Sequence, residues 1–404
     1  MAKVFEGVRV IDFTQVIAGP YASYQLALQG ADVIKLEHPK GGDQGRVMMA
    51  GGPDYLEAGQ SSLFMAFNSN KRSLGLDLRN PDARDILRRL IESADVVVEN
   101  FKAGSMKRLG LDYATVKEWN PNIVYCSISG FGATGPLAGK AAYDPVIQAH
   151  SGMMTLTGYQ GVTGPTKVGF WVTDVAAGIH AAYAISSALF ARERTGEGRY
   201  IDLSMLDAAI GFISPMVLHY LNCEVEPQLM GNGSPAAAGV PSIYPTATNQ
   251  MQVATATQAQ FESMAGVLNR PDLVADPRFK DRIARAENGP ALYEELCKTY
   301  ITAPAKEWEK QLEAVGVPAG VVNTVPEMLQ NEQVLHRNVV QQVPPPNGLG
   351  KPMSMVNASF HLNEGSPSVE TPPPGIGQHT DEILGEIGLS ANDITKLRTD
   401  GVIG

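Results

Sequence analysis

Cysteine is scarce in this chain. The three cysteines, Cys126, Cys223 and Cys297, are far apart and odd in number. This pattern excludes a disulfide framework and any metal cluster built on a CxxC spacing. We therefore expect a protein of a reducing compartment, without a bound metal.

The chain also lacks an excess of positive charge and a convincing apolar anchor. Lys and Arg total 32 against 42 Asp and Glu, a net charge of −10, so nucleic acid is not an expected partner. Asp12 interrupts the apolar start where a signal peptide would need an unbroken core. The longest uncharged apolar run, residues 175–191, is Ala-rich and short for a membrane span. We expect it to be a buried helix of a cytoplasmic protein that needs no membrane.

Several motifs of well-known enzymes are missing. The loop after the first predicted strand is TQVIAGP, which lacks the GxGxxG pattern of dinucleotide sites. A phosphate-binding GxxxxGK[ST] loop, an HExxH zinc motif and a GxSxG nucleophile elbow are also absent. The sequence therefore gives no support to nicotinamide, ATP, zinc or serine-hydrolase chemistry.

Apolar strands alternate with amphipathic helices in the first half of the chain, which predicts a parallel sheet in a doubly wound α/β domain. Expected strands cover 8–13, 32–37, 95–101, 122–131 and 199–205, and expected helices cover 19–31, 82–94, 113–119 and 206–219.

A stretch rich in Gly, Pro and Ala, residues 223–240, predicts a linker. A smaller α/β lobe should follow, with a strand at 251–257 and helices at 258–268, 292–299 and 308–315. Pro-rich boundaries at 344–346 and 372–374 bracket a tail whose last helix is expected at 381–387.

Polar residues follow the predicted strands, where ligands of parallel sheets bind. Gln15, Asn100 and Asp174 are the main candidates. Asn100 and Phe101 together suit a planar base or an amide-bearing ligand, although a turn residue and a core ring are the more ordinary interpretation. Nearby cations could bind phosphates or be merely solvated; these are Arg46, Lys71, Arg72, Arg79, Lys102 and Arg108.

Asp174 lies in KVGFWVTDVAAGIH, between apolar neighbours at the expected start of a helix. From this segment alone, a helix N-cap is the more ordinary role of Asp174. A positioned, partly desolvated carboxylate that attacks a thioester carbonyl is the alternative.

A series of segments, in one order over nearly the whole chain, resembles the class III (CaiB/BaiF-type) coenzyme A transferases, the family of formyl-CoA:oxalate and carnitine CoA-transferases. The segments are GVRVIDFTQVIAGPYAS, GADVIKLEHPKGGDQGR, FNSNKRSLGLDL, DVVVENFKAGSMKRLGLDY, YDPVIQAHSG, VTDVAAG, RPDLVADPRF and GVPAGVV.

The resemblance implies a Rossmann-like large domain, a smaller α/β domain and an interlocked homodimer. With the boundaries above, residues 1–222 and 331–404 form the large domain, 223–240 the first linker and 241–330 the small domain. Coenzyme A is then a substrate and no cofactor is tightly bound. Asp174 takes the place of the catalytic aspartate, and the implied CoA contacts are Val16, Ala18, His38, Leu76, Arg79, Asn100, Phe101, Lys102, Arg108 and Tyr143.

Three positions depart from the family pattern. His38 replaces an arginine beside the adenine, which keeps a stacking contact without the charge. Ala141 replaces a lysine, with Lys140 next to it. The loop GNGSPAAAG replaces a run of glycines, which argues against oxalate as the acceptor. Gln15 and Gly233 are candidate contacts of the substrate acid.

The resemblance predicts transfer of CoA from an acyl-CoA, such as succinyl-CoA, to a carboxylic acid through intermediates on Asp174. The alternative within the fold is an α-methylacyl-CoA racemase, which has a histidine where this chain has Tyr143. A phenol is a poor base at neutral pH, so the transferase is favoured. A non-catalytic CoA-binding protein, with Asp174 as a helix cap, is the third possibility.

Overall fold

Two compact units make up the chain. A computed structural model describes residues 3–233, 242–346 and 349–404. The first unit contains Met1–Ser151, Gly169–Val217 and Arg337–Gly404, and the second contains Gly152–Val168 and Leu218–His336. The expected boundaries after 222 and 330 lie a few residues away from these divisions.

Residues 152–168 were expected in the large domain but group with the second unit. Tyr159 forms an isolated antiparallel bridge with Met230, and the Gly231 amide donates to the Gly158 carbonyl at 2.8 Å. These backbone contacts between distant segments gave no periodic signal in the sequence.

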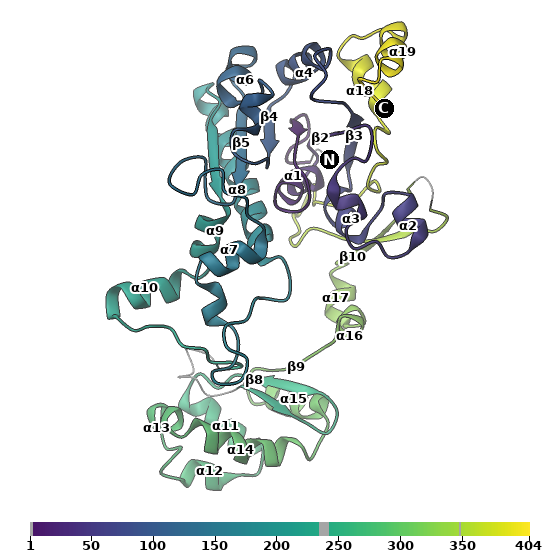
Figure 1. Ribbon diagram of the computed structural model, residues 1–404. Coiled ribbons are helices and arrows are strands. Elements are labelled where there is room, and N and C mark those ends of the chain that lie inside the picture. The colour runs from purple at the N-terminus through teal and green to yellow at the C-terminus, as the bar shows by residue number, and fades with distance from the viewer. Residues whose placement is uncertain (1–2, 234–241, 347–348) are drawn as a thin grey trace. The chain divides into compact units, whose positions relative to one another are not determined.

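A six-stranded sheet forms the centre of the first unit (Figure 1), in the order β3-β2-β1-β4-β5-β6. Its neighbouring strands pair in parallel. The predicted parallel sheet is therefore confirmed. The strands are β1 (Arg9–Asp12), β2 (Asp32–Glu37), β3 (Lys71–Gly75), β4 (Val96–Glu99), β5 (Val124–Ser129) and β6 (Tyr200–Ser204).

Helices cover both faces of this sheet, as expected for a doubly wound fold. The predicted helices of the first half are present with small shifts of their ends, except for the one expected at 206–219, which is divided into α9 (Met205–Phe212) and α10 (Ser214–Cys223). Several short helices were not predicted. The helices up to the end of β6 are α1 (Ala18–Leu28), η1 (Gln44–Val47), α2 (Pro53–Glu57), α3 (Ser62–Asn68), α4 (Ala83–Glu92), α5 (Ser105–Arg108), α6 (Tyr113–Trp119), α7 (Asp144–His150), η2 (Met153–Leu156) and α8 (Val172–Thr195).

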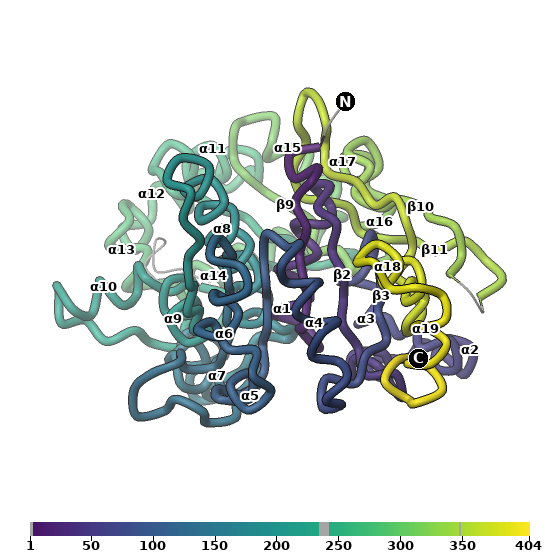
Figure 2. Tube along the Cα trace, turned by 90° about the horizontal axis from the view of Figure 1, so that it is seen from above, coloured from purple at the N-terminus to yellow at the C-terminus, as the bar shows by residue number. Residues whose placement is uncertain are grey.

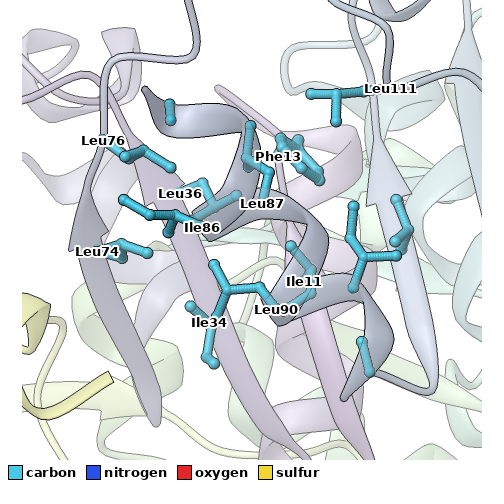
Figure 3. Packing of buried hydrophobic residues seen from close by; sticks show 14 of the residues in the cluster. Ile11, Phe13, Ile34, Leu36, Leu74, Leu76, Ile86, Leu87, Leu90 and Leu111 are labelled. Carbon is cyan, nitrogen blue, oxygen red and sulfur yellow. The ribbon is translucent and has the colours of Figure 1, made fainter. Parts of the chain in front are cut away.

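One face of the sheet packs against α4 in a continuous apolar core (Figure 3). Ile11 and Ile34 from the strands meet Ile86 and Leu90 from α4. Ile11, Ile34 and Leu90 have no exposed surface. The spacing of Ile86, Leu87, Leu90 and Ile91 places one apolar stripe of α4 on the sheet.

Helix α8 is the predicted Ala-rich helix, and it is the one described helix that is long and apolar enough to cross a membrane. It packs beside α1, α9 (Met205–Phe212) and β5. Ala177, Gly178 and Ala181 are buried. A Cβ at Gly178 would lie 2.8 Å from the Ala18 carbonyl oxygen, so glycine permits a close approach to α1. These contacts are those of a core helix.

The C-terminal segment returns to the first unit after residue 336. Strands β10 (Val340–Val343) and β11 (Met353–Val356) form an antiparallel pair whose Val343 and Met355 pack with Tyr24 and Leu28 of α1. Figure 2 shows the yellow end of the chain beside β3, where Leu76 and Ile403 form a bridge.

The expectation that the last helix lies at 381–387 is wrong. Helix α18 (Thr380–Glu386) occupies that place, but α19 (Ala391–Thr399) follows it. Ser390 and Asp393 form a capping box at the start of α19. This Ser-x-x-Asp spacing was the available sequence signal.

The second unit is built on a three-stranded antiparallel sheet of β7 (Ile243–Pro245), β8 (Gln250–Val253) and β9 (Ala319–Val321). Its core joins Met251 of β8 to Phe261, Leu296 and Trp308 from three helices. The three predicted helices are present as α11, α14 and α15. The helices are α10 (Ser214–Cys223), which begins in the first unit, α11 (Gln258–Val267), α12 (Pro271–Ala275), α13 (Arg282–Glu287), α14 (Gly289–Tyr300), α15 (Ala305–Glu313), α16 (Val325–Leu329) and α17 (Glu332–His336).

We expect Leu90→Ala to lower the free energy of unfolding by about 2–5 kcal/mol, because it opens a cavity between α4 and the sheet. Urea unfolding followed by circular dichroism measures this loss. Arg88→Ala is the matched control on the same helix, since the Arg88 side chain is 58% exposed and should change the value by less than about 0.5 kcal/mol. Equal losses for both variants would contradict this packing.

Candidate active site in the first unit

The direction in which the sheet grows reverses between β1 and β4, and the candidate residues lie at that point. Gln15 follows β1, and Asn100 follows β4. The Gln15 amide donates to the Asn100 Oδ1 at 2.8 Å, and the Asn100 Nδ2 donates to the Gln15 carbonyl at 2.8 Å. This pair of bonds fixes the two strand ends at the position where ligands bind in open parallel sheets.

Two cavities of the first unit meet beside this pair. The Asp174 cavity has a volume of about 370 Å³, and its wall includes Asp174, Lys140, Tyr143 and Met205. The Arg79 cavity has a volume of about 580 Å³, and its wall includes His38, Leu76, Arg79 and Arg108. Gln15, Gln44 and Phe101 line both cavities, so the two volumes adjoin.

The structure brings nearly all of the sequence-predicted site residues to these cavities. Those of the Asp174 cavity are Gln15, Val16, Ala18, Asn100, Phe101, Lys102, Tyr143 and Asp174. His38, Leu76, Arg79 and Arg108 line the Arg79 cavity. Gly233 belongs to the second unit, where its amide donates to the Met230 carbonyl at 2.8 Å.

Asp174 is the third residue of α8 and is not its N-cap. The helix begins at Val172 after the cap residue Trp171, and no side chain caps it. Since Asp174 and Gly178 are four residues apart, they share the helix face that lies against α1. The close approach at Gly178 therefore places Asp174 beside the loop that leads into α1.

The Asp174 carboxylate makes no hydrogen bond or ion pair with the part of the chain that the structure describes. Burial raises the pKa of its carboxyl to about 7, and the nearby charge of Asp144 adds to this shift. A carboxylate without a partner, at the wall of a cavity, is a suitable nucleophile because no hydrogen bond must be broken before it attacks.

Asp144 orients the start of α8. Its Oδ1 accepts from the Thr173 amide at 2.9 Å and from the Thr173 hydroxyl at 2.8 Å. Its Oδ2 accepts from the Gln148 Nε2 at 2.6 Å. Asp144 therefore fixes Thr173, the residue before Asp174, and places a negative charge near the Asp174 carboxylate. Tyr143, which precedes it, is the N-cap of α7 and is 70% exposed.

The first turn of α8 offers fewer oxyanion donors than a free helix N-terminus. The Val172 amide donates to the Phe170 carbonyl, and the Val175 amide donates to the Trp171 carbonyl. The Thr173 amide is held by Asp144. Among the described residues, the amide of Asp174 itself is the one in this turn without a recorded acceptor.

Glu99 supports the other wall at the end of β4. Its carboxylate accepts from the Phe101 amide at 2.8 Å and from the Ser127 hydroxyl. Burial raises the pKa of Glu99 to about 7. The Phe101 ring packs partly against the apolar core, as the more ordinary interpretation expects, and it also lines both cavities.

Three of the cations considered for phosphate binding are structural. The Lys71 Nζ is buried and lies 3.0 Å from the Asp12 Oδ2. Arg46 is buried and forms a two-pronged pair with Glu37 at 2.7 and 2.6 Å. Arg72 pairs with Asp32 and with acidic residues of α18. Arg79, Lys102 and Arg108 line the cavities instead.

Sequence reasoning missed Gln44, Asp144 and Glu99. Gln44 follows β2 in the segment GGDQGR, and Glu99 ends β4, so their places after or at a strand end were an available signal. Asp144 lies in the segment YDPVIQ, but nothing in the sequence brings it to the start of α8.

The chain is similar in sequence to two curated CoA-transferases. The succinate–glutarate CoA-transferase of Agrobacterium fabrum is 34% identical over 391 residues, covering 94% of this chain and 95% of that protein. The succinyl-CoA:glutarate CoA-transferase of Mus musculus is 32% identical over 402 residues, covering 99% of this chain and 90% of that protein.

The chain is also similar to a solved structure in fold and sequence. The crystal structure of a CaiB/BaiF family protein from Brucella suis is 32% identical, covers 96% of this chain and 100% of that chain, and has a TM-score of 0.85. A family model described as CoA-transferase family III matches residues 5–380. The chain therefore belongs to CoA-transferase family III and is a class III CoA-transferase.

Proposed function

We propose that this enzyme transfers CoA between two carboxylic acids through covalent intermediates on Asp174. The observation that carries the proposal is the unpaired Asp174 carboxylate at the wall of a cavity. An attacking carboxylate needs access to a carbonyl carbon and freedom from competing hydrogen bonds, and Asp174 satisfies both conditions.

The reaction proceeds in four balanced steps. The Asp174 carboxylate attacks the acyl carbon of the donor, the C–S bond breaks, and an acyl-aspartyl anhydride and a CoA thiolate form. The thiolate attacks the aspartyl carbonyl and expels the donor acid as its carboxylate, which leaves an aspartyl-CoA thioester. The acceptor carboxylate attacks this thioester to form a second anhydride and the thiolate. Attack of the thiolate on the acceptor acyl carbon then frees Asp174.

Thioester energy is kept throughout this cycle, so the proposal requires no ATP. Water must be kept from both anhydrides, because hydrolysis would release the acid and lose the energy. We expect the loop 231–239 to exclude water. Most of that loop lies outside the described residues, and Gly233 within it remains a proposed contact of the substrate acid.

The CoA moiety is assigned to the Arg79 cavity and the neck where it meets the Asp174 cavity. Arg79 and Arg108 supply guanidinium groups for phosphates. His38 and Leu76 offer surfaces for the adenine. Asn100 and Phe101, together with Lys102, Val16, Ala18 and Tyr143, line the path to Asp174.

A dicarboxylate pair is the proposed substrate class. Both curated relatives described above are named for succinate or succinyl-CoA and glutarate. We therefore propose succinyl-CoA as the donor and a dicarboxylate of similar size, such as glutarate, as the acceptor. Lys102 and Lys140 on the wall of the Asp174 cavity are cations that suit a second carboxylate.

We also propose that the enzyme is a cytoplasmic homodimer. Helix α8 exposes Ile179 at 45%, Tyr183 at 72% and Phe190 at 60%, at spacings that place them on related faces of one helix. Large exposed apolar side chains are typical of surfaces that a partner covers. Light scattering coupled to size-exclusion chromatography should give twice the mass of the chain at all practical concentrations. A monomer mass at micromolar concentration would contradict this assembly.

Incubation with succinyl-CoA should leave a covalent mark on Asp174. We expect intact-mass spectrometry to detect an adduct of the size of CoA, and hydroxylamine to convert it to a hydroxamate at Asp174. Asp174→Ala should show neither product, because it lacks the attacking carboxylate. Transfer to glutarate should be lost by more than about 10³-fold, as for other variants without their nucleophile.

Asp207→Ala is the control, since Asp207 is an acidic residue in the first turn of another helix and does not line either cavity. Proton exchange at the α-carbon of an acyl-CoA in deuterated water, without any adduct, would overturn the transferase and support the racemase. An Asp174→Asn variant with full activity would favour the non-catalytic role of Asp174.

The pH dependence should follow the ionisation of Asp174. Its pKa is raised to about 7, and the protonated form cannot attack. We therefore expect kcat/KM to fall about tenfold for each pH unit below about 7 and to be level above it. Steady-state kinetics with succinyl-CoA between about pH 5 and about pH 9 measures this acidic limb of the pH profile.

Two variants test whether the fall of kcat/KM at low pH, the acidic limb of the profile, belongs to Asp174. Asp144→Asn removes the charge that adds to the shift and keeps an oxygen for the Thr173 donors, so the limb should move to lower pH. Glu99→Gln should leave the limb in place, although the pKa of Glu99 is also about 7. A limb that moves with Glu99→Gln and not with Asp144→Asn would contradict the assignment.

A further inference from the structure

Val16 has a backbone conformation that valine rarely adopts. Its φ is 69°, in the left-handed region where the branched Cβ crowds the backbone. The other described non-glycine residues with positive φ are Met49, Asn70, Glu224, Asn269 and Asn338, and none of them is β-branched. Such a strained residue persists where its surroundings hold it in place, and it is often found beside a ligand.

Polar side chains hold the peptide groups on the N-terminal side of Val16. The Val16 amide donates to the Asp43 Oδ1 at 3.0 Å. Asn100 holds the residue before Val16, because its side chain accepts from the Gln15 amide and donates to the Gln15 carbonyl. The Lys35 Nζ donates to the Thr14 carbonyl at 2.8 Å. The loop is thus tied to β2, to the loop that follows β2 and to the residue that follows β4.

The Val16 carbonyl stays available to a ligand. Val16 is the residue before the N-cap Ile17, so its carbonyl lies outside the series of helical hydrogen bonds of α1, which begins at the Ile17 carbonyl. Among the described residues, no donor to this carbonyl is recorded. Val16 lines the Asp174 cavity, so its conformation decides which backbone atoms the cavity presents.

Asp43 holds a second part of the wall with the same oxygen. The Asp43 Oδ1 also accepts from the Gly45 amide at 2.8 Å and so caps η1, the turn that begins with Gln44. The Asp43 Oδ2 lies 2.9 Å from the Lys35 Nζ, and both side chains have no exposed surface. Burial alone would raise the pKa of Asp43, but Lys35 and the backbone donors hold it below the ordinary value.

We propose that Asp43 is a positioning residue for CoA, because its buried carboxylate fixes Val16 in the wall of the Asp174 cavity and the turn of Gln44 in the neck between the cavities. The inference rests on the proposed binding of CoA in this neck. Asp43 does not line either cavity, so it acts through Val16 and Gln44. A purely structural Asp43 would affect folding without a specific effect on CoA affinity.

Asp43→Ser and Asp43→Asn form a matched pair. Both remove the charge opposite Lys35 and therefore share the cost of a broken buried ion pair. Asparagine keeps an oxygen that reaches both the Val16 and the Gly45 amides. Serine can still cap η1, but its shorter side chain cannot also reach Val16. The two variants therefore differ in whether the side chain at position 43 accepts a hydrogen bond from the Val16 amide.

Isothermal titration of the full-length variants with CoA is the first test. We expect Asp43→Ser to weaken CoA binding about tenfold more than Asp43→Asn, with KM for succinyl-CoA changing more than kcat. Adding Val16→Gly to Asp43→Ser should recover most of that tenfold difference, because glycine adopts positive φ without the clamp. Equal affinities for Ser and Asn, or no recovery with glycine, would overturn the inference.

A failure of the CoA-transfer mechanism can be distinguished from a failure of the positioning role of Asp43. A wild-type enzyme that binds CoA but transfers it to no acid overturns the transferase mechanism and leaves the Asp43 comparison decisive. A wild-type protein that does not bind CoA overturns both. If Asp43→Ser does not fold, Asp43→Ser with Val16→Gly decides, since release of the strain should restore folding. A double variant that also fails to fold overturns the inference.

Discussion

The reciprocal hydrogen bonds between Gln15 and Asn100 are the constraint on which the site depends. They join the ends of β1 and β4, the neighbouring strands from which the sheet grows in opposite directions. Because the helices that follow these strands lie on opposite faces, a gap opens beyond the strand ends. The amide of Asn100 joins the two strand ends and lines the Asp174 cavity, while its neighbours Gln15 and Phe101 line both cavities.

The buried cations of the first unit are paired with carboxylates and stabilise the fold, whereas the carboxylate proposed as the nucleophile has no partner. Lys35, Lys71 and Arg46 are buried, and each has a carboxylate partner. An uncompensated buried charge is costly, so these pairs hold the loops after β1 and β2 firmly. Asp174 has no such partner, and its raised pKa is the consequence. The stable frame permits one carboxylate to remain unsatisfied where the reaction needs it.

Much of the fold could be predicted from the sequence because its signals are local. The apolar strand 96–99 and the amphipathic stripe of α4 are periodic patterns, and both appear where they were expected. Strand β3 was missed, since Lys71 and Arg72 give it a polar start; their partners Asp12 and Asp32 lie far away in sequence. The same long-range pairing explains why Lys71 and Arg72 were considered for phosphates, whereas Arg46 pairs with Glu37 only nine residues away.

The candidate site was found by resemblance more than by residue pattern, and the reason is physical. A lone aspartate near a helix start is most often the N-cap. Only the structure shows that Trp171 is the N-cap of α8, while Asp174 lies in the first turn on the face toward α1. The small residue Gly178 makes this possible, because any side chain there would meet the Ala18 carbonyl. Helix–helix distance, set by one glycine, therefore decides whether the carboxylate four residues earlier reaches the loop of Val16 or stays away from it.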